Sequence, residues 1–320
     1  MQIVHSLEQR ITERPVILTI GKFDGVHLGH RRLILQAIER ASVTGSVSAV
    51  LTFHPHPRTV LNPKVEFKLL TSIEERAALV AELGADYFVV VPFNHETMST
   101  PAYEYVVRLC TAMPIRELWV GAGFALGRKR EGTVERLREI GQELGYTVGT
   151  VGPVELDGQV VSASRVRHLL GDGAIEQANQ LLGRAFWVRG VVQQGDQRGR
   201  TIGFPTANLS VAPDHIVPAN GVYACWSVIE SGPYASAEPL PTVTNVGVRP
   251  TFDGTRRTIE AHLLDWSGDL YGQTLRLSFG ERLRAERKFA DIDELVAQIG
   301  QDAQQARTIL QAITAKARNE

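Results

Sequence analysis

Two histidines, His27 and His30, stand in a glycine-rich stretch that has the composition of a phosphate-binding turn. The stretch reads GKFDGVHLGH and lies between a short apolar run and a helical pattern. A helix that begins there offers free backbone N–H groups and a partial positive charge to an anion. Gly21, Gly25 and Gly29 allow close approach of the backbone, and the imidazoles can stabilise charge that develops on a phosphate.

Two other interpretations of this stretch stay open. It can be a packed loop that contains two histidines by chance, or it can be part of a metal site. Two histidines supply only half of the ligands that a structural zinc ion requires, so the metal site is the weaker alternative.

A second polar group, Ser162, Ser164, Arg165 and Arg167, surrounds the start of an expected helix. Serine hydroxyls, backbone donors and two cations at a helix entrance suit a triphosphate, and Arg165 would neutralise charge during group transfer. In the alternative interpretation, one of the serines caps the helix and the arginines are solvated.

A third candidate site lies between Gly190 and Asn208, where the chain reads GVVQQGDQRGRTIGFPTAN. The chain has no Walker sequence, so a kinase site here must hold its nucleotide in another way. A glycine-rich loop can wrap phosphates with its amides, while Thr206 and Asn208 offer oxygen ligands to a hydrated Mg²⁺. The alternative is a purely structural turn of a β-barrel.

Glu260 lies in an apolar strand pattern, beside Ile259 and near Leu263, where a carboxylate has no value for packing. As a general base it would take the proton from a hydroxyl that attacks a phosphate, a contribution to the rate of about 10² to 10⁴. The alternative is a solvated carboxylate that pairs with Arg256 or Arg257.

The first half of the chain alternates strand and helix patterns that would position the first two groups. The expected strands are Val16–Ile20, Val47–Phe53, Tyr87–Val91, Glu117–Val120 and Thr147–Val151. The expected helices contain the apolar series Leu33, Ile34, Ala37 and Ile38, then cover Ser72–Leu83, Pro101–Ala112 and Thr133–Leu144. Strands separated by such helices pair in parallel, which predicts a doubly wound sheet with its ligand at the carboxyl ends of the strands.

The second half changes character after two short helices, Ser164–Leu170 and Gly173–Leu182, which end at Gly171 and Gly183. Alternating runs separated by Gly, Pro and Asn predict a small antiparallel barrel. Its expected strands are Phe186–Val192, Tyr223–Ile229, Thr242–Val246, Thr258–Leu264 and Thr274–Leu277, and a last helix over Asp291–Ala315 follows with Asp291 as its N-cap. We therefore expect two domains, residues 1–183 and 184–320.

The composition is that of an ordinary globular protein, with 320 residues, 34 basic and 35 acidic side chains. It excludes a collagen repeat or a coiled-coil rod, and the near-neutral charge argues against nucleic acid or an anionic membrane as a partner. No apolar run marks a signal peptide or a membrane span, so we expect a cytoplasmic protein. Cys110 and Cys225 have apolar neighbours and are expected to be buried thiols.

The stretch Gly121-Ala-Gly-Phe-Ala-Leu-Gly127 also follows an expected strand and looks like a dinucleotide-binding turn. Its glycine spacing, Gly-x-Gly-x-x-x-Gly, is one residue longer than the dinucleotide-binding fingerprint Gly-x-Gly-x-x-Gly. The basic run Arg128-Lys-Arg130 follows it in place of the apolar core of a helix. We therefore do not expect an NAD-dependent oxidoreductase.

The stretch that ends in His27-Leu-Gly-His30 resembles the signature of nucleotidylyltransferases, and its longer form resembles the adenylylating half of bacterial bifunctional riboflavin kinase/FMN adenylyltransferases (FAD synthetases). The runs TFHPHP over residues 52–57 and VSASRVR over residues 161–167 resemble two further motifs of that family. The alternative for the former is a rigid turn. The resemblance implies an ATP site made by Gly21, Phe23, Asp24, Gly25, His27, Gly29, His30, Ser162, Ser164 and Arg165, with His27, His30 and Arg165 catalytic. It implies a flavin site made by Phe53, Pro55, His56, Pro57, Gly123 and Phe124.

Gly123 departs from that family pattern, in which an Asp or Asn usually stands at this place, and Arg and Phe commonly stand where this chain has Ala125 and Leu126. Loss of a polar side chain beside the flavin removes a directional contact worth about 0.5 to 3 kcal/mol. The resemblance therefore implies an adenylyl step that is weaker or differently anchored.

The segment that ends GFPTAN resembles the riboflavin kinase motif, and GVY at 221–223, NVGVRPT at 245–251 and EAHLLD at 260–265 follow in the family's order. The resemblance implies a kinase ATP site made by Gly190, Gly195, Gly199, Arg200, Gly203, Phe204, Pro205, Thr206 and Asn208, with Mg²⁺ on Thr206 and Asn208. It implies a riboflavin site made by Asn245, Gly247, Arg249, Glu260 and His262, with Glu260 as the catalytic base. Trp187, Trp226 and Trp266 are expected in the barrel core rather than against the flavin.

These resemblances imply a Rossmann-like nucleotidylyltransferase domain followed by a β-barrel riboflavin kinase domain with a C-terminal helix. The implied enzyme phosphorylates riboflavin with MgATP to FMN and then adenylylates FMN to FAD. Its partners would be small molecules, with no nucleic acid and no membrane, and the chain would be a monomer or a weak homo-oligomer. Two alternatives stay open: a riboflavin kinase whose first domain is weak or inactive, and a flavin-binding module without catalysis.

Overall fold

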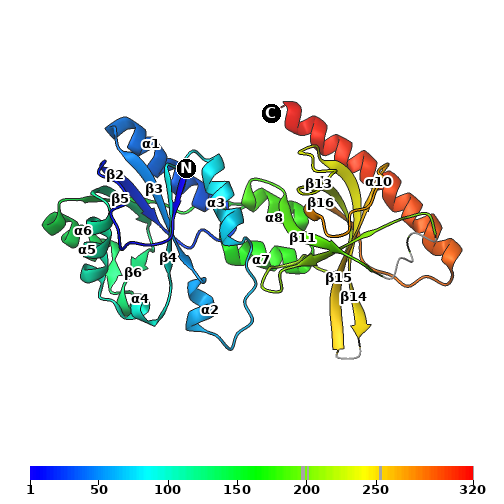
Figure 1. The fold of residues 1–320 in the computed structure, drawn as a ribbon, viewed down its shortest axis with the longest axis horizontal. Coiled ribbons are helices and arrows are strands. Elements are labelled where there is room, and N and C mark those ends of the chain that lie inside the picture. Colours follow the sequence, from blue (N-terminus) through cyan, green and yellow to red (C-terminus); the bar gives the residue numbers. More distant parts are fainter. Residues whose placement is uncertain (196–198, 200–201, 252–253, 320) are drawn as a thin grey trace. The chain divides into compact units, whose positions relative to one another are not determined.

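The computed structural model describes residues 1–195, 199, 202–251 and 254–319. These residues form two compact units, Met1–Ala163 and Ser164–Glu320 (Figure 1). The sequence assigns residues 164–183 to the first domain, whereas contacts group them with the second unit, because helix α8 packs on strands β11 and β16. As an assignment of function, the boundary at residue 183 stays a prediction. In the described part of the chain, no helix is both long and apolar enough to cross a bilayer.

The first unit is built on a parallel sheet in the order β1-β4-β3-β2-β5-β8. The strands are β1 (Gln2–Val4), β2 (Val16–Ile20), β3 (Val47–His54), β4 (Tyr87–Pro92), β5 (Ile115–Gly121) and β8 (Thr147–Val151). The predicted doubly wound sheet is confirmed. The edge strand β1 is not predicted, because three largely exposed residues carry no periodic pattern.

Helices connect these strands, and small hairpins extend the loops. The helices are α1 (Leu28–Thr44), α2 (Pro57–Leu61), α3 (Ile73–Glu82), α4 (His95–Ser99), α5 (Ala102–Ala112) and α6 (Val134–Leu144). The hairpins are β6 (Ala125–Leu126) with β7 (Gly132–Thr133), and β9 (Glu155–Leu156) with β10 (Gln159–Val160); a 3₁₀ turn, η1, covers Arg128–Arg130. Helices α2 and α4 have five residues each, which is too short for an apolar period to predict.

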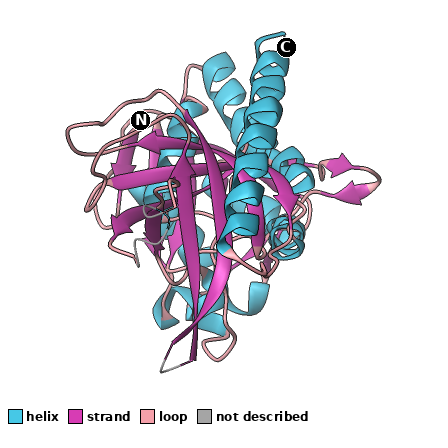
Figure 2. Ribbon diagram, turned by 90° about the vertical axis from the view of Figure 1, so that its right-hand side faces the viewer, coloured by secondary structure: helices cyan, strands magenta, loops and turns pink. Residues whose placement is uncertain are grey.

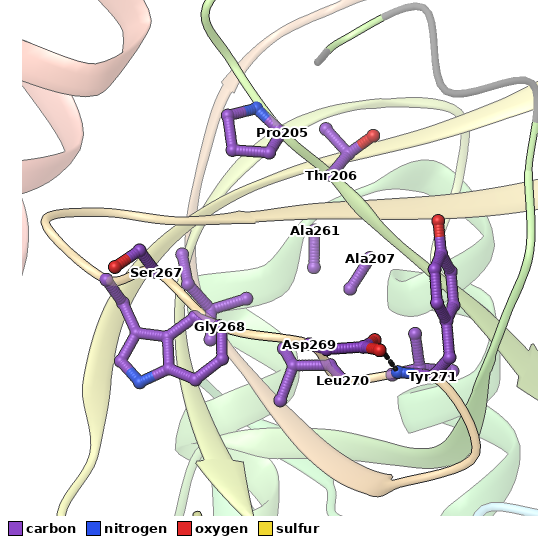
Figure 3. Close-up of a pocket in the computed structure, with 12 residues that line it drawn as sticks. Pro205, Thr206, Ala207, Ala261, Ser267, Gly268, Asp269, Leu270 and Tyr271 are labelled. Atoms are coloured by element: carbon purple, nitrogen blue, oxygen red, sulfur yellow. Dashed lines mark hydrogen bonds between the residues drawn. The ribbon is translucent and has the colours of Figure 1, made fainter.

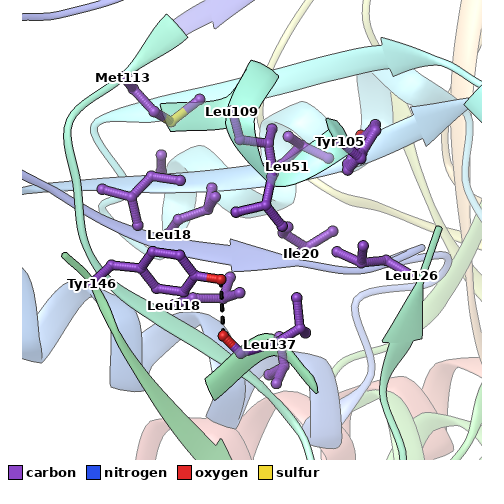
Figure 4. Packing of buried hydrophobic residues seen from close by; sticks show 14 of the residues in the cluster. Leu18, Ile20, Leu51, Tyr105, Leu109, Met113, Leu118, Leu126, Leu137 and Tyr146 are labelled. Atoms are coloured by element: carbon purple, nitrogen blue, oxygen red, sulfur yellow. Dashed lines mark hydrogen bonds between the residues drawn. The ribbon is translucent and has the colours of Figure 1, made fainter. Parts of the chain in front are cut away.

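The core of this unit lies between the sheet and the helices that cover it. Figure 4 shows Leu18, Ile20 and Leu51 from the strands against Leu109 from α5 and Leu137 from α6. Strand β2 is buried along its whole length, which is typical of a parallel strand with helices on both faces. The rigid sheet therefore fixes the loops at its carboxyl edge.

The second unit begins with helices and continues into a closed antiparallel barrel in the order β11-β12-β15-β14-β13-β16. The helices are α7 (Ala163–Asp172) and α8 (Ile175–Leu182); the strands are β11 (Phe186–Gln193), β12 (Ala207–Val211), β13 (Gly221–Ile229), β14 (Leu240–Thr251), β15 (Gly254–Leu263) and β16 (Thr274–Arg284). The predicted barrel is confirmed, although the short strand β12 is not predicted. Helix α7 runs past Gly171 and ends before Gly173, whose φ of 77° provides the left-handed residue after a helix; the predicted end at Gly171 is wrong.

Helix α10 (Ile292–Asn319), the long cyan coil that ends at C in Figure 2, packs on β13, β14 and β16. The Asp291 carboxylate accepts a hydrogen bond from the Glu294 backbone N–H at 2.8 Å, so the predicted N-cap is confirmed. Ala303, Ala306 and Leu310 of this helix are buried against Val222 and Val243 of the barrel. The face of β13 and β14 that carries Val222 and Val243 is therefore the outer face of the barrel, on the side of α10.

Candidate active sites

The loop between β2 and α1 places both histidines at the N-terminus of α1. His27 is the N-cap residue, and its Nδ1 accepts a hydrogen bond from the His30 backbone N–H at 3.4 Å. With Nδ1 used as this acceptor, Nε2 is the ring nitrogen that can donate to a ligand. The two imidazoles stack with their centroids 3.7 Å apart and their planes 18° apart. The pair thus combines imidazole donors with the free N–H groups of a helix start.

Two buried side chains hold this loop in place. Phe23 is fully buried, and the Asp24 carboxylate is 1% exposed. Asp24 accepts hydrogen bonds from the backbone N–H groups of Leu70 and Thr71, both at 3.0 Å, and lies 3.8 Å from the Arg76 guanidinium. Both side chains are therefore positioned to support the loop, while their contacts with ATP stay predictions.

A cavity of about 870 Å³ opens at the carboxyl edge of the sheet. Six residues that the sequence assigns to nucleotide or flavin binding line it: Gly21, His30, Phe53, Pro57, Gly123 and Phe124. They belong to the carboxyl end of β3 and to the segments that follow β2, β3 and β5, which meet at this edge. His56 instead caps α2, with its Nδ1 accepting from the Arg58 backbone N–H at 3.1 Å, and stacks on Phe67. Pro55, which follows a cis peptide bond, is likewise not among the lining residues.

The charged residues that line the cavity are all basic within the described part of the chain: Lys22, Arg58, Lys129 and Arg130. The backbone of Lys129 and Arg130 has positive φ angles, 51° and 62°. Such angles are uncommon for residues other than glycine, and they cluster at binding and active sites. Arg130 donates to the Gly123 carbonyl at 3.2 Å. Sequence reasoning does not assign these cations, because they become neighbours only through the fold. Four positive charges suit an anionic ligand such as a nucleotide phosphate.

Tyr105 of α5 adds a polar group that the sequence does not reveal, because its position belongs to the apolar face of the helix. Its side chain lines the cavity and is 5% exposed, and its buried hydroxyl has no partner among the described residues. Burial raises the pKa of Tyr105 above its usual value, so the hydroxyl stays protonated at neutral pH. A buried hydroxyl of this kind can donate a hydrogen bond to a ligand that fills the cavity.

The serine and arginine group lies at the start of α7. Ser162 ends the loop of the first unit, whereas Ser164 and Arg165 belong to the second unit by their contacts. Ser164 is exposed and Arg165 is half-buried. Their contact with a nucleotide in the first unit stays a prediction.

Adjacent strands of the barrel place three polar residues side by side. This polar row consists of Asn208, Glu260 and Asn245. Asn208 of β12 pairs with Glu260 of β15, and Glu260 pairs with Asn245 of β14. The alternate residues Ile259 and Ala261 are buried inside the barrel. Glu260 and its two partners therefore point to the outer face, since successive side chains of a strand alternate.

Gly247 of β14 and His262 of β15 also point to the outer face, because each is two residues along its strand from Asn245 or Glu260. Thr206 directly precedes β12. His262 pairs with Val243, whose side chain packs on the α10 side of the barrel. The His262 Nδ1 lies 2.8 Å from the Pro205 carbonyl, so it donates to the segment before Thr206.

Several predicted glycines of the barrel have neighbours that leave no room for a side chain. A Cβ at Gly190 would lie 2.8 Å from the Ser210 carbonyl oxygen, and one at Gly195 would overlap the Asn208 amide. A Cβ at Gly199 would overlap the Phe204 carbonyl oxygen, and the Gly199 carbonyl accepts a hydrogen bond from the Phe204 N–H at 2.8 Å. Arg200 and the Arg249 side chain lie outside the described residues. The glycines thus allow close packing of the loop, and their contacts with phosphates stay predictions.

A second cavity, of about 520 Å³, lies at the barrel mouth (Figure 3). Ala207 and Ala261 point into it, Pro205 and Thr206 border it, and the segment 266–271 closes its other side. The prediction that Trp266 belongs to the barrel core is wrong, because this side chain lines the cavity.

The other two predicted core tryptophans are half-buried. Trp187 lies under the Arg184 guanidinium, 4.2 Å from its ring centroid, and Trp226 packs with the α10 cluster. Neither ring lies within the barrel core. Successive side chains of a strand point to opposite faces, and the buried neighbours of these tryptophans take the inner face.

The alternative role for Glu260, an ion pair with Arg257, does not match the contacts of that arginine. Arg257 donates to the carbonyls of Val217 and Pro218 and to the Asn220 side chain. The Arg256 side chain lies outside the described residues. An ion pair with Arg257 therefore does not account for a carboxylate in this row.

Comparisons with known proteins match both units. The FAD synthetase family model matches residues 9–165, and the riboflavin kinase family model matches residues 182–310. The bifunctional riboflavin kinase/FMN adenylyltransferase of Bacillus subtilis is 35% identical over 91% of this chain and 91% of its own length. The Escherichia coli K12 protein of the same name is 36% identical over 95% of each chain.

A solved structure described as a macrolide-efflux protein from Streptococcus pneumoniae has a TM-score of 0.87 and 28% sequence identity, covering 96% of this chain and 99% of that one. The two family matches, the identities and the coverage agree with the two sets of residues in the two units. The chain therefore belongs to the bifunctional riboflavin kinase/FMN adenylyltransferase family.

Proposed function

We propose that this protein converts riboflavin to FAD in two steps, one in each unit. The barrel transfers the γ-phosphoryl group of ATP to riboflavin, which gives FMN and ADP. The parallel-sheet unit then joins FMN to the AMP part of a second ATP, which gives FAD and pyrophosphate. The observation that carries the proposal is that each unit gathers its own motif residues around one place, His27 and His30 beside a cationic cavity and Glu260 within a polar row.

In the kinase step, Glu260 acts as the general base. Its carboxylate takes the proton from the 5′-hydroxyl of the ribityl chain as that oxygen attacks the γ-phosphorus. Asn208 and Asn245, the neighbours of Glu260 in the ladder, are placed to orient the reacting groups on the same outer face. Positioning of this kind is the main contribution of a protein to phosphoryl transfer.

Thr206 and Asn208 fit a magnesium ion at this site. Thr206 directly precedes β12 and Asn208 is the second residue of that strand, so a hydroxyl and an amide lie close together in the chain beside Glu260, the ladder partner of Asn208. Mg²⁺ prefers such oxygen donors together with waters and substrate phosphates. When bound, the ion would neutralise charge on the ATP phosphates.

In the adenylyl step, a phosphate oxygen of FMN attacks the α-phosphorus of ATP, and the bond to pyrophosphate breaks. The FMN phosphate is already a nucleophile, so the step needs no base and no covalent intermediate. His27 and His30 position the α-phosphate and stabilise its developing charge through imidazole N–H groups and the start of α1. Arg165 neutralises the triphosphate, and the cations at Arg58 and Lys129 support binding of the anionic substrates.

The direct test is a time course with the pure protein, riboflavin, ATP and magnesium, followed by chromatography of the flavins. FMN should rise first and then give way to FAD. FMN that accumulates alone would favour a kinase with an inactive first unit, and bound flavin without ATP consumption would favour a binding module.

Both steps use ATP, which supports a cytoplasmic location for the protein. That the protein is a monomer or a weak homo-oligomer stays a prediction.

The loss of an acidic residue at Gly123 leads to a separate prediction. Gly123 is exposed at the cavity, and a Cβ there meets nothing within 4 Å, so Gly123→Asp can be accommodated. The new carboxylate would accept a hydrogen bond from the flavin imide N–H, which should lower the KM for FMN about three- to tenfold. Steady-state FAD formation measures this KM.

Gly123→Ala is the matched control, because it adds the side-chain carbon without an acceptor. Its KM for FMN should stay at the wild-type value. Equal KM values for the Asp and Ala variants would contradict a directional contact at this position.

A further inference from the structure

We propose that Glu286 makes the kinase site selective for uncharged riboflavin over its phosphorylated product, an inference that rests on the proposed kinase function. Glu286 lies in the segment between β16 and α10, outside the motifs that the sequence analysis singles out. Its carboxylate reaches the same outer face of the barrel that carries Glu260. Its role would be to accept hydrogen bonds from a polyol chain and to disfavour a phosphate dianion.

The position of the carboxylate follows from the space above Gly247. A Cβ at Gly247 would overlap Oε1 of Glu286 and would lie 3.1 Å from its Cδ. The same point lies 3.3 Å from Nδ2 of Asn245. The Glu286 carboxylate and the Asn245 amide are therefore close neighbours, and Asn245 is the direct cross-strand partner of Glu260.

A fixed network holds Glu286 in this place. Asn220 donates from Nδ2 to the Glu286 carboxylate at 3.0 Å. The side-chain oxygen of Asn220 in turn accepts from Arg257 at 3.3 Å, and Arg257 also donates to the Val217 carbonyl. Asn220 is thus oriented by a cation, with its amide donor facing Glu286. Because Glu286 remains exposed, a ligand on the outer face can reach its carboxylate.

Glu260, by strand register, and Glu286, by its position above Gly247, therefore both lie beside Asn245 on the outer face. The ribityl chain of riboflavin carries several hydroxyl donors and no charge, so an ionised acceptor binds it well. The product FMN carries a phosphate of charge about −1.5 to −2 at neutral pH. A second carboxylate near the base would repel that phosphate, which favours release of FMN after transfer.

The test compares Glu286→Gln with the wild-type enzyme in riboflavin phosphorylation, with FMN as a product inhibitor. The glutamine keeps the shape and the hydrogen bond to Asn220 but removes the charge. We expect the inhibition constant for FMN to fall about fivefold and the KM for riboflavin to rise about threefold, with little change in kcat. Glu238→Gln, in the exposed loop before β14, is the matched control and should leave both constants unchanged.

Two further measurements separate a charge effect from a structural one. Raising the salt concentration should strengthen FMN inhibition of the wild type, because salt screens repulsion, but should have a smaller effect on Glu286→Gln. Gly247→Ala, which displaces the carboxylate, should also strengthen FMN inhibition relative to riboflavin binding.

An unchanged ratio of the FMN inhibition constant to the riboflavin KM in Glu286→Gln would overturn the inference. A wild-type protein that does not phosphorylate riboflavin would instead contradict the proposed kinase function. These two failures are distinguishable because the first requires an active wild-type enzyme.

Discussion

Replacing Glu260 with glutamine should lower the kcat for riboflavin phosphorylation about 10²- to 10⁴-fold, because the variant has no base for the attacking hydroxyl. The glutamine has nearly the same shape, so the ladder between Asn208 and Asn245 is retained. When FMN is supplied directly, the variant should form FAD at the wild-type rate. Chromatography of reactions started with riboflavin or with FMN measures the two steps separately.

The control for this prediction is the thermal unfolding temperature of the variant, which should stay close to that of the wild type. Glu260 is only half-buried and lies on the outer face, so loss of its charge leaves the packed barrel interior unchanged. Riboflavin phosphorylation at the wild-type rate would show that Glu260 is not the base. Loss of both activities with normal folding would contradict the division of the two steps between the two units.

The sequence predicts most of the sheet and the barrel because their strands are long enough to carry a pattern. Val16–Ile20 and Thr147–Val151 are strands with the predicted limits. The strand Ala207–Val211 is not predicted, because its five residues directly follow a glycine- and proline-rich segment. Short elements are decided by their tertiary partners, in this case β11 and β15, rather than by local periodicity.

The candidate sites are predicted in part, for a similar reason. His27, His30 and Glu260 stand out because histidine at a helix start and glutamate in an apolar strand are unusual locally. Tyr105 does not, since a tyrosine on the apolar face of a helix normally packs in a core. Arg130 becomes significant only because the turn at η1 brings it back to Gly123.

Contacts between residues far apart in the sequence also distinguish residues that support a site from residues that act in the reaction. Asp24 belongs to the same motif as His27, yet its carboxylate is engaged by Leu70 and Thr71 at 3.0 Å. A sequence motif lists both residues without this distinction. Glu286 shows the converse, since it belongs to none of the motifs and still lies beside Asn245 on the outer face.

Replacing His27 with asparagine should lower the rate of FAD formation from FMN and ATP about 10²- to 10³-fold, a loss typical of removing one donor that stabilises a transition state. Asparagine is chosen because His27 is the N-cap of α1, and an asparagine side chain can also accept the hydrogen bond from the His30 N–H. The variant therefore keeps the cap but loses the imidazole Nε2–H. His30→Gln, at a residue that lines the cavity, should cause a loss of the same order.

Riboflavin phosphorylation provides the internal control in both histidine variants, because the barrel does not contain these residues and should keep its wild-type kcat. The expected result is thus FMN that accumulates without FAD. Wild-type FAD formation by His27→Asn would mean that His27 serves only as a helix cap. If His30→Gln alone were impaired, charge stabilisation would depend on the imidazole that lines the cavity rather than on the stacked pair. Loss of both reactions in a folded variant would instead show that the two units do not act independently.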